Sequence, residues 1–491
     1  MHTFCRETRN NRPMRRAAIE IVAALAVIFA GQDASAHALA QRYDLPLPLG
    51  YYLLASGAAV AVSFLILALF MRRPSAAPLR DFNERPLAGG TVPAAIVIAG
   101  RTFFVAVLVL VVVAGLFGNQ AVFKNIAPVT VWVIWWVGLS LFSAFVGNVW
   151  TIFNPWAAIF AVAEKLAARW ELPLSLRVPY PSRLGAWPAC ALFLLFAWFE
   201  LVANGRDVPR NIAVAIAIYS VITWTGFVLF GRKAWLRNGE VFSIAFGLFG
   251  RFAPLHFAAH APWTWKLRPY AVGLLTRRPL SPSMTAFTIL MLATVSVDGL
   301  METPLWRATV EGILSGTSDA AKPMTYQLLA TALLIMGPIT LAALYFAVIG
   351  VMTRIAPGPD LVDGAGLFVL SLVPIAIAYH LAHYFSLLAI AGQFIIPLVS
   401  DPFGYGWDLF GTILYRIDIG IVDARFIWYL SVIAIVTGHI IAVWLAHLTA
   451  FAVYADAAAA RRSQYPMLAL MIAYTMLSLW ILAEPIVAPA K

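Results

Sequence analysis

Histidines and carboxylates occur inside long apolar runs of this sequence, where ionisable groups are costly to insert and are often functional. His380 and His383 are spaced i, i+3, so they share one helix face. His439 lies about as far into the next apolar run, so helical rise brings all three to a similar depth. Because converging imidazoles are typical of zinc, copper and iron sites, the three are predicted to bind a divalent transition metal.

Two carboxylates are the predicted catalytic residues beside this metal. Glu200 lies near the middle of one apolar run and Asp298 lies in another. Each could donate an oxygen to the metal, orient a histidine, or act as the general base that deprotonates water. The alternative is that these polar groups only form hydrogen bonds between neighbouring helices.

Other polar residues receive more ordinary interpretations. His447 is expected to be structural, and His256 and His260 are expected to be exposed. Asp401 and Asp408 lie among glycine, proline and aromatic residues, a composition that predicts a capping turn and leaves a role at the site open.

The elements that position these residues must be membrane spans. The 491 residues are 62% hydrophobic and 12% charged, whereas a soluble domain has roughly 25% charged residues. The net charge of +11 is distributed in short clusters beside apolar runs. This distribution indicates topology signals and contact with lipid head groups, and not a nucleic-acid-binding face.

The N-terminus has the composition of a secretory signal. Arginines precede an apolar stretch, and Ala34-Ser35-Ala36 supplies a small-x-small cleavage pattern, so residues 1–36 are predicted to be removed. Cleavage leaves His37 at the mature N-terminus and Cys190 as the single cysteine, which excludes a disulfide within the mature chain. His37 could chelate copper through its amine and imidazole, or be incidental.

The mature chain, 37–491, is predicted to be a single all-α domain, a polytopic bundle of about ten spans in a bacterial inner membrane. Lys and Arg are roughly twice as frequent in the predicted inner segments as in the outer ones, which places both mature termini outside. Segments near 150–185 and 232–281 are predicted to form helices at the inner interface, and residues 399–425 an outer loop. The predicted spans are 50–71, 95–117, 128–149, 186–204, 211–231, 282–302, 326–353, 366–398, 426–452 and 466–487.

The C-terminal third carries a family resemblance. Its motifs are His383-Tyr384-Phe385-Ser386-Leu387-Leu388, the segment from Ser400 to Gly411, Trp428-Tyr429, Gly438-His439, Leu445-Ala446-His447 and Arg462-Ser463-Gln464-Tyr465. Together with Asn148-Val149-Trp150 and Asn154-Pro155-Trp156, they resemble the membrane-bound fenitrothion hydrolase family. The resemblance implies hydrolysis of organophosphate triesters, with a companion subunit as a possible partner.

Three functions follow as hypotheses. The first is a metal-assisted hydrolase of organophosphate triesters, whose apolar substrate enters from the bilayer. The second is a transporter or metal-handling permease that uses the same histidines and carboxylates. The third is a structural subunit of a membrane complex. ATP-driven transport is disfavoured because the sequence lacks a P-loop.

Overall fold

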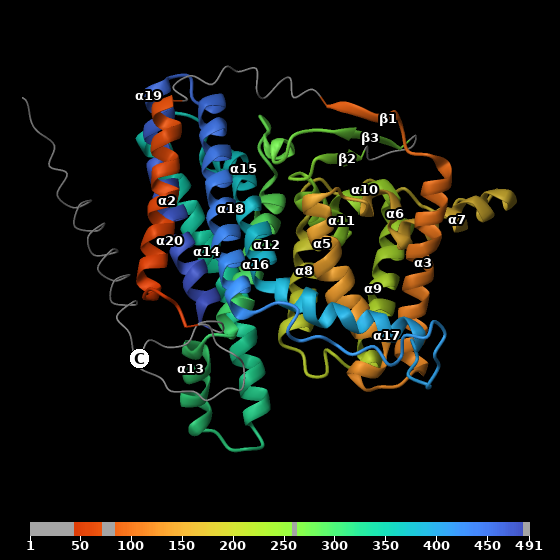
Figure 1. The fold of residues 1–491 in the computed structure, drawn as a ribbon. Coiled ribbons are helices and arrows are strands. Elements are labelled where there is room, and N and C mark those ends of the chain that lie inside the picture. The colour runs from red at the N-terminus through yellow and green to blue at the C-terminus, as the bar shows by residue number, and fades with distance from the viewer. Residues whose placement is uncertain (1–43, 71–83, 258–262, 485–491) are drawn as a thin grey trace, which may run out of the picture.

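The computed structural model describes residues 44–70, 84–257 and 263–484, and the statements below concern those residues. Long apolar helices stand side by side in one bundle (Figure 1). In the described part of the chain, 9 helices are long and apolar enough to cross a bilayer. The prediction of an all-α polytopic membrane protein is therefore confirmed. The predicted signal peptide, His37 and His260 lie outside the described residues.

The candidate spans are Leu49–Phe70 (α2), Ala94–Phe117 (α3), Ile126–Phe145, Pro209–Phe230 (α9), Pro282–Met301 (α12), Lys322–Ile355 (α14), Leu361–Ser400, Ala424–Val453 (α18) and Ala457–Ala483. Ile126–Phe145 comprises α4 (Ile126–Pro128), the π-helix η3 (Val129–Gly138) and α5 (Leu139–Phe145). Leu361–Ser400 comprises α15 (Leu361–Phe368), η6 (Val369–Leu372), α16 (Val373–Ile390), η7 (Ala391–Phe394) and α17 (Ile395–Ser400), and Ala457–Ala483 comprises α19 (Ala457–Ser463) and α20 (Tyr465–Ala483). The remaining helices are α6 (Trp150–Phe153), α7 (Pro155–Ala167), α8 (Trp187–Leu201), α10 (Arg232–Asn238), α11 (Val241–Gly250) and α13 (Pro304–Ser315).

The predicted fourth span, 186–204, is shorter than the other spans. It forms α8, which has 15 residues and is therefore about 22 Å long. That length is less than the roughly 30 Å of hydrocarbon in a typical bilayer. Glu200, predicted near the middle of its apolar run, therefore lies in the last turn of α8.

A three-stranded antiparallel sheet at one end of the bundle corrects the prediction for 232–281. Its first part is helical, as α10 and α11. It then forms the strands Leu255–Phe257 (β2) and Thr264–Leu267 (β3), followed by the short 3-10 helix η5 (Val272–Leu274). The strand Arg85–Thr91 (β1) completes the sheet in the order β1-β3-β2. Strands β2 and β3 pair locally, and β3 has a second partner, β1, in a segment far away in the sequence that local propensity could not reveal. We call this end the sheet face and the opposite end, where residues 401–423 lie, the loop face (Figure 1).

The loop between α17 and α18 is held by its own aspartates. Asp401 accepts hydrogen bonds from the backbone N–H groups of Tyr405 at 2.9 Å and Gly406 at 2.7 Å. Asp408 accepts one from the Ile413 N–H at 3.1 Å. These are the bonds of a capped turn, so the geometry favours the capping interpretation over a role at the site.

Small residues bring α16 close to its two neighbours. A Cβ atom on Gly438 of α18 would lie 2.5 Å from the Cβ of Ala378 and 2.8 Å from the Pro374 carbonyl oxygen. A Cβ atom on Gly299 of α12 would lie 2.5 Å from the hydroxyl of Tyr379. Gly438 therefore permits the close backbone approach that is typical of packed membrane helices, and Gly299 leaves room for the Tyr379 side chain.

Replacing Gly438 with alanine should destabilise the bundle by about 1–3 kcal/mol, because the added methyl group meets backbone and side-chain atoms that cannot move aside. A thermal melt of the purified protein measures the effect. Gly312→Ala is the matched control, since a Cβ atom there would meet nothing within 4 Å. Equal melting temperatures for Gly438→Ala and the wild type would contradict the close packing of α16 and α18.

Candidate functional site

Asp298 links the two helices that carry most of the candidate residues. Its Oδ2 atom lies 2.9 Å from the Nε2 atom of His383 on α16. The hydroxyl of Tyr384 donates a second hydrogen bond to the same oxygen at 2.5 Å. One carboxylate oxygen of α12 therefore joins two consecutive side chains of α16.

The start and end of α12 are fixed by local sequence. Ser281 caps its first turn by accepting from the Met284 N–H at 3.4 Å, and Pro282 occupies the first turn, where its missing N–H costs nothing. The helix ends at Met301, and Thr303 caps α13 directly afterwards. Asp298 thus lies in the last turn of α12, near the loop face and not at the middle of the bundle.

The carboxylate of Asp298 is mostly buried and therefore needs hydrogen-bond partners within the protein. Its side chain is 16% exposed, and the side chain of His383 is 7% exposed. A carboxylate held away from water is strongly destabilising unless charge and hydrogen bonds compensate it. His383 and Tyr384 supply that compensation, so the three residues behave as one unit.

A small cavity lies beside this unit and contains further candidate residues. His380, Tyr384 and Glu200 line it, together with apolar side chains of α8, α11 and α12. The cavity volume is about 20 Å³, which is enough for one or two water molecules. The structure therefore brings Glu200 and His380 to the wall of one water-sized space, and Tyr384 connects that wall to Asp298 and His383.

His380 has an unusual environment for a histidine. Its ring is surrounded by the rings of Trp136 at 5.7 Å, Phe249 at 5.8 Å and Tyr384 at 4.8 Å between centroids. Its Nε2 atom is buried and has no hydrogen-bond partner among the described residues. Buried polar atoms normally have a protein or water partner, so this nitrogen is suited to bind a water molecule in the adjoining cavity.

His439 has different partners from His380 and His383. Its Nδ1 atom lies 2.8 Å from the carbonyl oxygen of Ile435, one turn earlier on α18. Its ring lies 6.1 Å from that of Tyr474 on α20, whose hydroxyl contacts Ser296 at 2.5 Å. His439 thus belongs to contacts among α18, α20 and α12.

The predicted metal site needs three donors at one point. Within residues 44–70, 84–257 and 263–484, no group of three or more His, Cys, Asp or Glu side chains is placed to hold a metal ion. His380, His383 and His439 do not form such a group. Asp298 contacts Nε2 of His383, and the Ile435 carbonyl contacts Nδ1 of His439. Equal depth in the membrane did not ensure that the three rings face one another.

Two further histidines can be placed. His447 is fully buried and its Nδ1 atom lies 2.9 Å from the side-chain oxygen of Gln464, a bond that suits the expected structural role. His256 is on β2 with its side chain 44% exposed, as expected for a surface residue. Tyr384 and Trp136 belong to the site and were not among the predicted site residues. The spacing of Tyr384 from His380, i, i+4, was the available signal for it.

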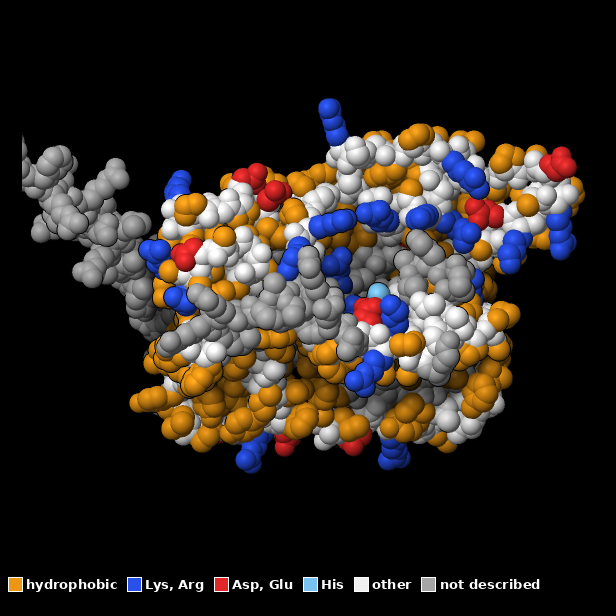
Figure 2. Space-filling view, turned by 90° about the horizontal axis from the view of Figure 1, so that it is seen from above, with side chains coloured by type: hydrophobic (Ala, Val, Ile, Leu, Met, Phe, Trp, Pro, Cys, Tyr) orange, Lys and Arg blue, Asp and Glu red, His pale blue; other side chains and the backbone are white. Residues whose placement is uncertain are grey.

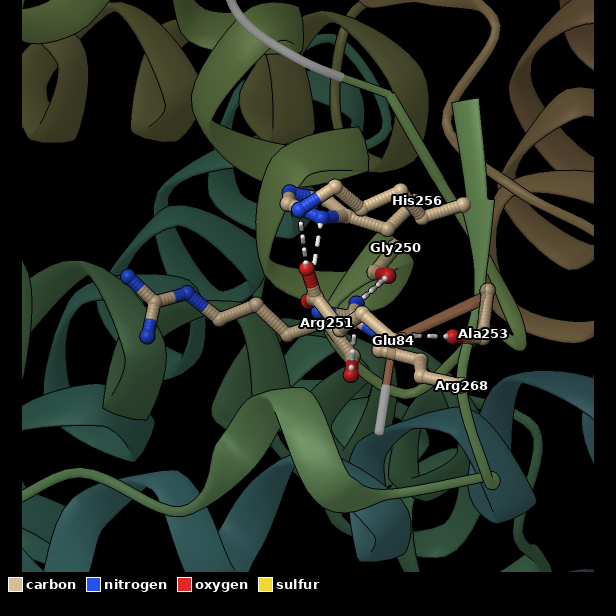
Figure 3. Close-up of polar contacts among 7 residues, drawn as sticks. Glu84, Gly250, Arg251, Ala253, His256 and Arg268 are labelled. Atoms are coloured by element: carbon tan, nitrogen blue, oxygen red, sulfur yellow. Dashed lines mark hydrogen bonds and ion pairs between the residues drawn. The ribbon is translucent and has the colours of Figure 1, made fainter. Parts of the chain in front are cut away.

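A second polar cluster lies on the sheet face (Figure 3). Glu84 lies 3.1 Å from the Nζ atom of Lys266 and 3.3 Å from Nδ1 of His256. Arg268 donates to the carbonyl oxygens of Gly250, Arg251 and Ala253 at 2.8–3.1 Å. The cluster ties β1, β2 and β3 to the end of α11.

The charges of this cluster act on one another. Partial burial works to raise the pKa of Glu84, but the hydrogen bond from Lys266 and the neighbouring positive charges outweigh it, and the pKa is lowered overall. Burial and the charge of Arg268 lower the pKa of His256. At neutral pH the contact between His256 and Glu84 is therefore mainly a hydrogen bond to a neutral imidazole.

The lowered pKa of Glu84 predicts a pH-dependent contribution to stability. The contribution is fully present above the unfolded-state pKa and is lost as the pH falls through the lower folded-state pKa. Glu84→Gln should therefore reduce stability by about 1 kcal/mol or less at neutral pH, and the difference from wild type should vanish in acid. Melting temperatures measured against pH test this. Glu311→Gln, an exposed change on α13, should show no such dependence, and a difference that persists in acid would rule out the ionic explanation.

Comparison with known proteins gives no further identification: no family model, curated protein or solved structure matches this chain.

Proposed function

We propose that this multi-pass membrane protein is a hydrolase of apolar organophosphate triesters and that its active site is an acid–base centre around Asp298. The observation that supports it is the sharing of Asp298 Oδ2 by His383 and Tyr384, next to a water-sized cavity lined by Glu200 and His380. The resemblance to the fenitrothion hydrolase family adds the substrate class. An apolar substrate is also suited to a site surrounded by lipid-facing helices.

In this proposal the cavity holds the attacking water. Glu200 or the Nε2 atom of His380 accepts a proton from that water as its oxygen attacks phosphorus. The bond from phosphorus to the aryl oxygen breaks, and the phenolate leaves with the electron pair. Asp298 and His383 hold the hydroxyl of Tyr384 at the cavity wall and keep the local charge balanced. The surrounding apolar side chains strengthen these interactions by excluding bulk water.

The sequence-based metal hypothesis has less support from this arrangement. A zinc, copper or iron ion would lower the pKa of a bound water and polarise the phosphoryl oxygen. His380, His383 and His439 do not converge, so no step above is assigned to a metal. General-base chemistry by the protein's own side chains is the version that the contacts favour.

A proton-coupled permease is the second candidate, and one observation favours it. The cavity beside Glu200 has space for water but not for an aryl phosphate, so an ester would have to displace neighbouring side chains. Buried carboxylates and histidines also mark proton paths in transporters. A route between the last turn of α12 and α8 would use the same residues.

Substitutions at the centre distinguish the candidates. In proteoliposomes, Glu200→Gln should lower the rate of fenitrothion hydrolysis by about 10²–10⁴-fold with little change in melting temperature. Asp298→Asn should lower the same rate and also lower the melting temperature, because it removes a buried charge that His383 compensates. His256→Asn, on the sheet face, should keep the wild-type rate. Dialysis against a chelator should leave the rate unchanged. If the chelator removes both the activity and a stoichiometric metal, the metal mechanism is favoured instead.

If the wild-type protein does not hydrolyse fenitrothion, the enzyme proposal is wrong. Proton flux measured in the same proteoliposomes would then decide the matter. Flux that is lost in Glu200→Gln and Asp298→Asn would establish the permease instead. Neither activity in the wild type would favour a structural subunit.

The proposed orientation puts the loop face outside a bacterial inner membrane and the sheet face inside. Basic side chains spread across the sheet face (Figure 2). The elements at that end contain Arg85, Arg232, Lys233, Arg237, Lys266, Arg461 and Arg462. This excess has the direction that the positive-inside rule requires of a cytoplasmic face.

A reporter fused after Lys491 tests the orientation. Alkaline phosphatase should be active there, and a fluorescent protein that matures only in the cytoplasm should be dark. The same pair of reporters inserted after Asn238, at the end of α10, should give the reverse result. Cytoplasmic signals at the C-terminus would invert the proposed orientation.

A further inference from the structure

A second, much larger cavity lies on the other side of α8. Its volume is about 360 Å³, which is in the range of small-molecule binding sites. Helices α3, α8 and α9 and the π-helix η3 form most of its wall. In Figure 1, α3 and α9 stand on the right-hand side of the bundle, and α8 lies nearer its middle.

Different faces of α8 line the two cavities. On α8, Phe193 and Glu200 line the small cavity, whereas Leu195 and Phe199 line the large one. The two sites therefore have distinct walls, and the inference below does not rest on the proposed hydrolase activity.

The wall of the large cavity is almost entirely hydrocarbon. The indole N–H groups of two of its tryptophans are engaged elsewhere: Trp156 donates to Ser220 at 2.7 Å, and Trp198 donates to Thr331 at 2.9 Å. The hydroxyl of Tyr219 donates to Glu240 at 2.6 Å. These residues present ring carbons to the cavity, and Thr130 adds one hydroxyl. Water is a poor occupant, because a buried water molecule needs about 2–4 polar partners.

The cavity reaches the lipid-facing surface between α8 and α9. Leu195 of α8 and Ile218 of α9 both line it, and their side chains are 62% and 57% exposed. The two helices are consecutive in the chain but are not packed closely along their lengths, whereas α9 packs against α3 and α8 against α12. A hydrocarbon chain in the bilayer could enter through this gap without crossing a polar surface.

We infer that the large cavity binds one acyl chain of a membrane phospholipid, which enters sideways between α8 and α9. Protein interiors rarely leave spaces of this size unfilled, and an apolar cavity favours an apolar occupant. The acyl chain matches the wall in chemistry, and the bilayer supplies it at the opening. Its head group remains at the membrane surface.

Filling the cavity tests the inference. Ala215 of α9 lines the cavity, whereas Ala217 on the same helix is exposed and does not line it. Ala215→Phe should place a ring in the acyl-chain site, and Ala217→Phe adds the same ring on the lipid-facing side. Val107→Phe and Val109→Phe form a second such pair on α3, since Val107 lines the cavity and Val109 is 52% exposed.

The full-length protein is placed in nanodiscs of phosphatidylethanolamine that contain a probe lipid with a diazirine near the methyl end of one acyl chain. Photolysis and peptide mapping should place saturable cross-links on cavity-facing residues such as Phe199 and Ile216. Ala215→Phe should reduce those cross-links about tenfold, and Ala217→Phe should leave them unchanged. If Ala215→Phe does not fold, the α3 pair provides the same comparison.

Three results would overturn the inference. Cross-links confined to exposed residues, without saturation, would show annular lipid only. Equal labelling of the cavity-filling variants and their controls would show that the chain binds elsewhere. Saturable labelling by a diazirine-bearing free fatty acid, with none from the phospholipid probe, would assign the cavity to a free acid and reject the phospholipid.

Discussion

A carboxylate on a membrane helix must find its compensation within the protein, and Asp298 shows how this requirement organises the bundle. The Asp298 side chain is only 16% exposed, and His383 and Tyr384 both form hydrogen bonds with one of its oxygens. That contact joins the last turn of α12 to α16, and Gly299 leaves room beside it for the hydroxyl of Tyr379. The position of α16 in turn sets the water-sized cavity and the ring contacts of His380.

The same requirement explains a second buried acid far from the site. Glu240 is fully buried at the start of α11, where it accepts hydrogen bonds from two backbone N–H groups, at 3.2 and 2.7 Å. Tyr219 donates to it at 2.6 Å and Asn154 at 3.1 Å. These bonds fasten α9 and the turn before α7 to α11. Buried acids in this protein thus act as junctions between elements, because each must gather donors from several of them.

The two cavities differ in what their walls offer. The small one has a carboxylate, an imidazole and a phenol on its wall, so it suits water and proton transfer. The large one is lined mainly by aromatic and aliphatic side chains, and the polar atoms of Trp156 and Tyr219 on its wall are already bonded, so it suits hydrocarbon. Helix α8 serves both because successive residues of a helix point in different directions. The two cavities therefore share no lining residue although α8 contributes to both.

The sequence by itself determined the membrane class, most of the spans and a short set of candidate residues, since apolar runs must cross the bilayer and ionisable residues within them are few. It also determined which residues share a helix face, such as His380 and His383. Only the tertiary structure decided which faces meet: it paired Asp298 with His383, placed Glu200 beside His380, and left His439 among other partners. Depth along a helix follows from residue count, but the direction of a side chain towards a neighbour depends on helix rotation and packing. The pairing of β1 with β3 was not predicted either, because several spans separate the two strands in the sequence.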